Sequence, residues 1–146
     1  YVVSQSKSGV SLRKQSEVLN KEVIDLRDEV TKELQAKGKK LEEDKTLLAP
    51  EVFQERVTAL QTEAESKQQE LQAKVQKIQE AIQRASTSID SVMSPILTEI
   101  VNEKVAKILL DRQAILFGDP KLDISAEVVK RLNKRLPDIK VTISDE

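Results

Sequence analysis

Apolar side chains recur at helical spacing over most of residues 12–89. Successive apolar positions are usually three, four or seven residues apart, which keeps them on one narrow stripe of a helix. A stripe this narrow is typical of a coiled-coil seam, so the pattern predicts two long helices of similar length. The first stripe consists of Leu12, Leu19, Val23, Leu26, Val30, Leu34, Leu41 and Leu48, and the second of Phe53, Val57, Leu60, Ala64, Leu71, Val75, Ile78, Ile82, Ala85 and Ile89.

The segment Leu47-Leu48-Ala49-Pro50-Glu51 separates the two predicted helices. Pro50 has no N–H to donate, and it disfavours helical geometry at the residue before it. Proline also suits the first turn of a new helix, where Glu51 complements the helix dipole. We therefore predict an antiparallel helical hairpin, or arm, over residues 11–94 with its tip near 47–52. One unbroken helix kinked at Pro50 is the alternative, and the matched lengths favour the hairpin.

The predicted seam is imperfect. Polar residues stand where a strict repeat would place apolar ones, namely Gln15, Lys37, Lys45 and Lys67. Either the seam tolerates the long stems of these side chains, or the arm is loosely packed and can splay. The sequence leaves both interpretations open.

The pattern changes near Ser94-Pro95, where we expect a kink or a restart of the helix. Two short apolar runs follow, Ile108–Leu110 and Ala114–Phe117, and both are rich in residues that favour strands. Continuous apolar runs of this length predict strands that are covered on both faces. A turn at Asp111–Gln113 would join them.

A short helix and a final strand are predicted after these runs. Ser125 is the expected N-cap of the helix, which buries Val128, Val129, Leu132 and Leu136 and stops at Pro137. Residues 139–143 alternate between apolar and polar types, as a half-buried strand does.

Residues 1–10 and 95–146 together predict a small α+β body out of which the arm grows. Near the start of the chain we expect Gly9 to break the structure and Ser11 to cap the arm's first helix. A body of roughly fifty residues is too small to be robust alone, so oligomerisation is the simplest resolution. The candidates for a subunit-bridging core are Ile108, Leu110, Ile115 and Phe117.

Composition agrees with a long-helix protein and excludes several kinds of chemistry. Charged residues make up 34% of the chain and aromatic residues 2%, a profile typical of coiled coils. The net charge of −1, without a basic patch interleaved with aromatics, argues against nucleic-acid binding. The chain has no Cys and no His, which excludes cysteine nucleophiles, histidine bases and His or Cys metal sites.

No membrane-spanning or targeting segment is predicted. No run of 18 apolar residues exists, and no signal peptide is visible. The opening Tyr1-Val2-Val3 is typical of a sequence that has already been cut.

Three acids, Asp111, Asp119 and Asp123, lie close together in sequence around Gly118. A metal or phosphate site could be built from such a group. Turn and cap chemistry explains these residues more simply. We therefore expect that the protein is not an enzyme and that it has no catalytic, cofactor-binding or metal-binding residue.

Several segments resemble the Skp/OmpH-like periplasmic chaperones. The C-terminal part is the most specific: Lys107-Ile108-Leu109-Leu110-Asp111-Arg112-Gln113-Ala114-Ile115-Leu116-Phe117-Gly118-Asp119-Pro120, then Leu122-Asp123-Ile124-Ser125 and Val128-Val129-Lys130-Arg131-Leu132-Asn133. The predicted tip, Leu48-Ala49-Pro50-Glu51-Val52-Phe53, is similar to the family's helix–turn–helix tip. The opening Val3-Ser4-Gln5-Ser6-Lys7-Ser8-Gly9 is similar to the segment after the family's first strand.

The resemblance implies a jellyfish-like homotrimer in the periplasm. Strands from three bodies would form a β-containing trimerisation core, and three helical arms would enclose unfolded outer-membrane proteins without using ATP. The family's first strand would lie just before Tyr1. Well-known members are strongly basic, whereas only Arg84 stands near the family's proposed lipopolysaccharide-binding cluster, so binding of lipopolysaccharide or anionic membranes is not carried over.

Two functions follow from these expectations. The leading one is an ATP-independent holdase, with Leu47, Leu48, Val52 and Phe53 as candidate client contacts near the tip. For Leu48 and Phe53, packing across the turn is the competing interpretation. The alternative function is a structural coiled-coil tether or oligomerisation protein, whose arms would be uniformly packed and would bind no client.

Overall fold

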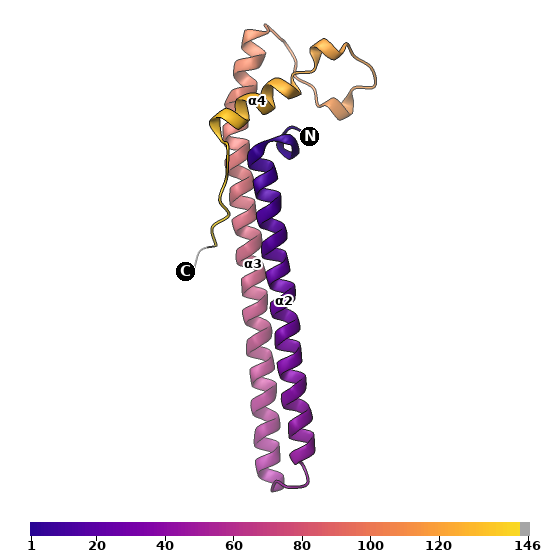
Figure 1. Ribbon diagram of the computed structural model, residues 1–146, viewed down its shortest axis with the longest axis vertical. Coiled ribbons are helices and arrows are strands. Elements are labelled where there is room, and N and C mark those ends of the chain that lie inside the picture. Colours follow the sequence, from indigo (N-terminus) through magenta and orange to yellow (C-terminus); the bar gives the residue numbers. More distant parts are fainter. Residues whose placement is uncertain (144–146) are drawn as a thin grey trace. The chain divides into compact units, whose positions relative to one another are not determined.

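The computed structural model describes residues 1–143 and is mostly helical (Figure 1). Its α-helices are α1 (Val2–Gln5), α2 (Lys7–Asp44), α3 (Pro50–Glu103) and α4 (Ser125–Arg135), with short 3₁₀ turns at Arg112–Ala114 and Pro120–Leu122. The chain divides into two compact units. We call Tyr1–Glu17 with Glu80–Glu146 the body unit, and Val18–Gln79 the hairpin unit. The predicted limits of the arm, 11 and 94, remain a prediction.

The hairpin unit reverses direction where the sequence predicts. Helix α2 ends at Asp44, and Pro50 is the first residue of α3. In the turn, the backbone N–H of Leu48 donates to the Asp44 carbonyl oxygen at 3.1 Å. The backbone N–H of Phe53 donates to the Ala49 carbonyl oxygen at 3.0 Å. Within this unit α2 and α3 lie side by side and antiparallel (Figure 1).

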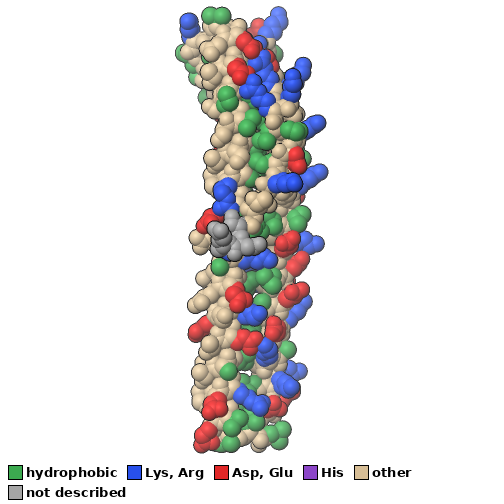
Figure 2. All heavy atoms as spheres, turned by 90° about the vertical axis from the view of Figure 1, so that its left-hand side faces the viewer, with side chains coloured by type: hydrophobic (Ala, Val, Ile, Leu, Met, Phe, Trp, Pro, Cys, Tyr) green, Lys and Arg blue, Asp and Glu red, His purple; other side chains and the backbone are tan. Residues whose placement is uncertain are grey.

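Apolar burial in the hairpin unit is confined to its end away from the turn. Val23, Leu71 and Ile78 are buried, whereas the structure describes every residue from 24 to 70 and leaves none of their side chains buried. Ion pairs instead connect the helices: Lys37 of α2 bonds Glu63 of α3, and the Arg56 Nη1 of α3 lies 3.6 Å from the Asp44 Oδ2 of α2. Charged and hydrophobic side chains are interspersed along the helices (Figure 2). The distal seam is therefore held by half-buried stems and charges.

The body unit is built around an aliphatic stripe on α3. Ala85, Ile89, Ile96 and Ile100 are buried and form one cluster with Val128 and Leu132 of α4 and with Ile139. The expected kink or restart at Pro95 does not divide α3, which continues to Glu103. One missing backbone hydrogen bond at the proline is outweighed by the burial of aliphatic side chains on both sides of it.

The expected break at Gly9 and cap at Ser11 are both wrong. The break falls at Ser6, whose extended backbone separates α1 from α2, and Gly9 and Ser11 lie inside α2. The Ser6 Oγ donates to the Val3 carbonyl oxygen at 2.7 Å and accepts from the Gly9 N–H at 3.0 Å. A Cβ on Gly9 would overlap the Val3 carbonyl oxygen. Gly9 is therefore needed for the close approach of α1 to α2, and it does not end a helix.

The three expected strands are absent from the described part of the single chain. Residues 108–110 and 115–117 lie in a loop around the Arg112–Ala114 turn, and residues 139–143 are outside any helix or strand. A strand needs a neighbouring edge to bond its backbone groups. These segments find no such edge within the described residues.

Helix α4 has the expected extent but a different start. It ends at Arg135, two residues before Pro137, with Lys134 and Arg135 in the last turn. Ser125 is the first residue of α4 and not its N-cap, and the N-cap residue, Ile124, makes no side-chain cap bond. The Asp123 Oδ1 takes that role by accepting from the Ser125 backbone N–H at 2.9 Å. A carboxylate two residues upstream thus replaces the expected hydroxyl.

The two helical glycines predict opposite outcomes on substitution by alanine. Gly9→Ala should destabilise the body unit by about 1–3 kcal/mol or more, because the new methyl group overlaps backbone. Gly38→Ala should stabilise α2 by up to about 1 kcal/mol, because the nearest atom, Leu60 Cδ2, lies 3.9 Å away. Thermal unfolding followed by circular dichroism measures both changes. A neutral Gly9→Ala would contradict the close approach.

Candidate functional site

Residues 105–117 of the body unit, which we call the apolar loop, expose many large hydrophobic side chains. Ile108 is 73% exposed and Phe117 is 96% exposed. The exposed large hydrophobic residues of this loop are Val105, Ile108, Leu109, Leu110, Ile115, Leu116 and Phe117. All four residues predicted for a trimer core are among them. Large exposed apolar patches are typical of interaction sites. The role of these residues in a trimer core remains a prediction.

The acids of this region shape the loop and the start of α4. The Asp111 Oδ1 accepts from the Gln113 N–H at 2.8 Å, and the Asp119 Oδ1 accepts from the Lys121 N–H at 2.9 Å. These bonds, with that of Asp123 to Ser125, confirm the interpretation as turn and cap chemistry. Among the described residues no acidic cluster could hold a metal ion.

Arg112 connects the apolar loop to two other segments. Its guanidinium carbon lies 5.1 Å from the centre of the Tyr1 ring. Its Nη1 lies 3.7 Å from the Asp123 Oδ2. Hydrogen bonds from Ser125, first from its side chain and then from its backbone, lower the pKa of Asp123, and the charge of Arg112 acts in the same direction.

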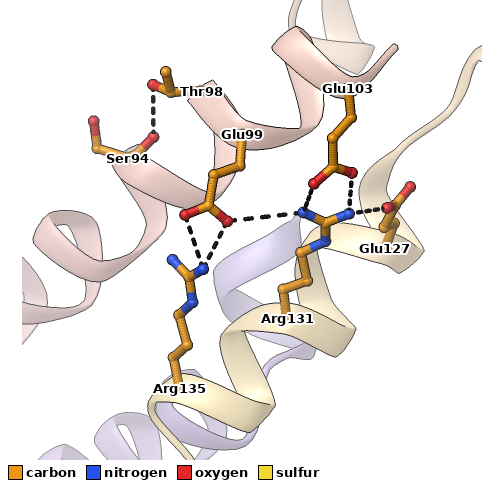
Figure 3. A network of polar contacts seen from close by, with 7 residues as sticks. All are labelled: Ser94, Thr98, Glu99, Glu103, Glu127, Arg131 and Arg135. Carbon is orange, nitrogen blue, oxygen red and sulfur yellow. Dashed lines mark hydrogen bonds and ion pairs between the residues drawn. The ribbon is translucent and has the colours of Figure 1, made fainter.

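A charged network joins α4 to the end of α3 (Figure 3). Arg131 donates to both Glu103 oxygens, at 2.8 and 2.5 Å, and to Glu127 at 2.6 Å. Arg135 donates to both Glu99 oxygens, at 2.9 and 2.6 Å. The Arg131–Glu103 pair uses two guanidinium nitrogens and two carboxylate oxygens, and such a bidentate pair holds geometry better than a single surface pair. The network therefore fixes α4 on α3, the two helices between which the apolar loop runs.

The sequence carried a signal for this network that the helical pattern alone did not reveal. Glu99 and Glu103 are four residues apart on α3, and Arg131 and Arg135 are four residues apart on α4. Matched spacing of opposite charges on two helices allows both pairs to form together. The spacing indicates a network only if α3 and α4 pack against each other, which the sequence alone does not show.

The C-terminal residues 138–143, which we call the docked segment, bond side chains of α2 and α3. The Gln15 Nε2 donates to the Ile139 carbonyl oxygen at 2.6 Å, and its Oε1 accepts from the Val141 N–H at 2.9 Å. The Ser11 Oγ donates to the Asp138 Oδ1 at 2.6 Å. Gln15, an irregular seam position in the sequence, thus bonds the backbone of a distant segment.

The tip residues predicted to contact clients differ in exposure. Leu47 is 81% exposed and Val52 is exposed, whereas Leu48 and Phe53 are half-buried. The Lys45 Nζ lies 5.7 Å from the centre of the Phe53 ring. Leu47 and Val52 are therefore the better placed of the four for contact with another molecule. Their role remains a prediction.

Comparison with known proteins gives one family and one similar fold. The family model described as "Outer membrane protein (OmpH-like)" matches residues 1–132. A crystal structure of a proposed outer membrane chaperone (OmpH-like) from Caulobacter crescentus CB15 is similar at a TM-score of 0.90 and 20% identity, over 99% of this chain and 86% of that one. At that identity the similarity shows the fold. No curated protein matches the chain.

In the described range, 1–143, no helix has the length and apolar character needed to cross a membrane.

The charged network predicts an acid-dependent loss of stability. Hydrogen bonds from Arg131 lower the pKa of Glu103 and Glu127 below the usual 4.5. Because the folded state lowers these values, their stabilisation is complete above about pH 4.5 and is lost as the pH falls through the lowered values. Arg131→Met should therefore lower the melting temperature of the body unit at pH 7, and the difference from the unsubstituted chain should shrink at low pH.

Arg13→Met is the matched control. Arg13 forms one exposed pair with Glu17, 3.8 Å apart, so its loss should change the melting temperature little. Thermal unfolding of the three proteins at pH 7 and at about pH 3 makes the comparison. An Arg131→Met effect that is constant with pH would contradict a role for these carboxylates.

Proposed function

Since the chain belongs to the OmpH-like family of outer membrane proteins, we propose that it is a chaperone. More specifically, we propose an ATP-independent periplasmic holdase. It encloses unfolded outer-membrane β-barrel proteins between helical arms and prevents their aggregation before insertion. No enzymatic activity and no cofactor belong to this proposal.

The open packing of the hairpin unit carries the proposal. The alternative, a structural coiled-coil tether, calls for a uniformly packed seam. From residue 24 to residue 70, a range described in full, the hairpin buries no side chain and presents apolar and charged groups together. A surface of this kind makes many weak contacts with a client whose strand edges would otherwise aggregate. Weak contacts also permit later release.

We also propose that three copies assemble through the apolar loop. In the single chain the loop exposes aliphatic and aromatic side chains that a monomer would leave in water. Its segments 108–110 and 115–117 lack strand partners within the described chain. Pairing of these segments between copies would satisfy both the backbone and the side chains. The lipopolysaccharide site is not proposed, because Arg84 instead lies 4.0 Å from Glu80 and donates to the Thr142 carbonyl oxygen.

Assembly predicts a definite mass. Sedimentation equilibrium at micromolar concentration should give three times the chain mass, and Phe117→Asp should shift the mass toward the monomer by placing a charge in the apolar interface. Leu47→Asp is the control, because Leu47 is also highly exposed but lies at the tip. The mass of this variant should stay trimeric. A monomer from the unsubstituted chain would contradict the assembly.

The holdase function predicts suppression of aggregation. A β-barrel membrane protein diluted from urea should scatter less light in the presence of the chain, whereas a tether would have no effect. Leu47→Ser should weaken this suppression modestly without changing helix content, because binding is spread over many contacts. Phe53→Ala should in addition lower the stability of the hairpin, by up to about 2–3 kcal/mol, because Phe53 is half-buried.

Circular dichroism on the same variants separates binding from folding. A complete loss of suppression from Leu47→Ser alone, with helix content intact, would contradict distributed binding and indicate a discrete site.

A further inference from the structure

Side chains of α2 and α3 bond the backbone of the docked segment in the way that the backbone of a neighbouring strand would. The carbonyl of Ile139 and the N–H of Val141 lie on the same edge of an extended chain, two residues apart. The carboxamide of Gln15 bonds both, at 2.6 and 2.9 Å, and so satisfies that edge with one donor and one acceptor. The Ser11 Oγ adds a bond to the Ile139 carbonyl oxygen at 3.3 Å, and an Arg84 nitrogen lies 3.4 Å from the Thr142 carbonyl oxygen.

Apart from the bond from the Ser11 Oγ to the Asp138 Oδ1, these contacts involve the backbone of the docked segment and not its side chains. Of the bonds to residues 139–142, each ends on a main-chain N–H or carbonyl, which every residue type except proline offers in the same way. Recognition of an extended chain through its backbone, with pockets for alternate side chains, is the logic of strand addition. The side chains of Ser11, Gln15 and Arg84 bond the docked segment in this backbone-directed way.

Side-chain burial in the docked segment alternates along the chain. Ile139 is 9% exposed and Val141 is half-buried against the same apolar cluster, whereas Lys140 and Thr142 are exposed. The surface therefore selects apolar side chains at every second position. Alternation of apolar and polar residues is the signature of strands in membrane β-barrels.

The docked segment is attached less firmly than α4. Among residues 138–143, only the side chain of Ile139 is buried. In α4, Val128 is 1% exposed and Leu132 is fully buried. Elements with few buried contacts open locally before the rest of the fold does. The segment can therefore leave its surface while α3 and α4 stay packed.

We propose that this surface is a binding site for an extended polypeptide with apolar side chains at alternate positions, and that the chain's own residues 138–143 occupy it as an internal competitor. The proposal deepens the proposed function, on which it rests, by naming the client feature that one site recognises. The docked segment, which itself alternates, is the intramolecular stand-in for a client strand. A client strand binds when the segment leaves.

The test uses the full chain and a fluorescent peptide with the sequence of residues 137–143. Ile139→Ser removes the buried anchor of the segment and should raise the apparent affinity for the peptide at least tenfold, because a larger fraction of the sites is open. Lys140→Ser is the matched control, since Lys140 is exposed, and it should bind like the unsubstituted chain. A peptide of the same composition with its aliphatic residues consecutive should bind at least tenfold more weakly.

The role of Gln15 is tested in the Ile139→Ser background. Adding Gln15→Leu should weaken peptide binding roughly 30-fold, the combined effect of two hydrogen bonds of ordinary strength. Gln83→Leu is the control, because Gln83 is an exposed glutamine of α3 in the same unit, and it should leave binding unchanged. Equal peptide binding by the unsubstituted chain and Ile139→Ser, or by both peptides, would overturn the proposal.

Hydrogen exchange of the unsubstituted chain decides the matter if Ile139→Ser fails to fold. The Val141 amide should exchange at least tenfold faster than that of Leu136, which bonds the Leu132 carbonyl oxygen at 2.7 Å in α4. Equal protection would mean that the segment leaves only on unfolding, and would overturn the proposal. If the peptide does not bind but the chain still suppresses aggregation, only the proposal of this site is wrong. If the peptide binds but the chain does not suppress aggregation, the proposed holdase function is wrong.

Discussion

The contact between the aliphatic stripe of α3 and helix α4 is the interaction on which the body unit depends. Ile89, Ile96 and Ile100 are fully buried there, and each contributes about 1.5–3 kcal/mol through loss of contact with water. Because aromatic residues are only 2% of the chain, this core is built from aliphatic side chains. The charged network and the docked segment both attach to this contact. The apolar loop is the connection between its two helices, and its side chains remain uncovered.

Local sequence signals predicted the helices well. Pro50 marks the start of α3 because proline suits a first turn, and Pro137 lies just beyond α4 because it cannot continue a helix. The sequence also predicts turn and cap roles for the three acids near Gly118, and each of them accepts a hydrogen bond from the backbone N–H two residues ahead. These features depend on neighbours in sequence, so the sequence alone contains them.

Features that depend on distant partners were not predicted. The sequence predicts a break at Gly9, because the close approach of this residue to the Val3 carbonyl depends on the fold. Gln15 reads in the sequence only as an imperfect seam position, because its partners, Ile139 and Val141, are distant in the chain. The strand propensity of residues 108–110 and 115–117 was real, but a strand forms only where another edge exists. Propensity thus indicated what these segments could do with a partner.

Assembly of three copies through the apolar loop, as proposed, would have a consequence for the amount of protein that a cell must make. A lone chain presents to its surroundings the kind of surface that a chaperone exists to shield. In a threefold assembly at equilibrium, the concentration of complete complexes rises with the cube of the free-chain concentration, so a modest fall in synthesis lowers their number disproportionately. Expression level would then control both how much chaperone is present and how much of it is itself in need of protection.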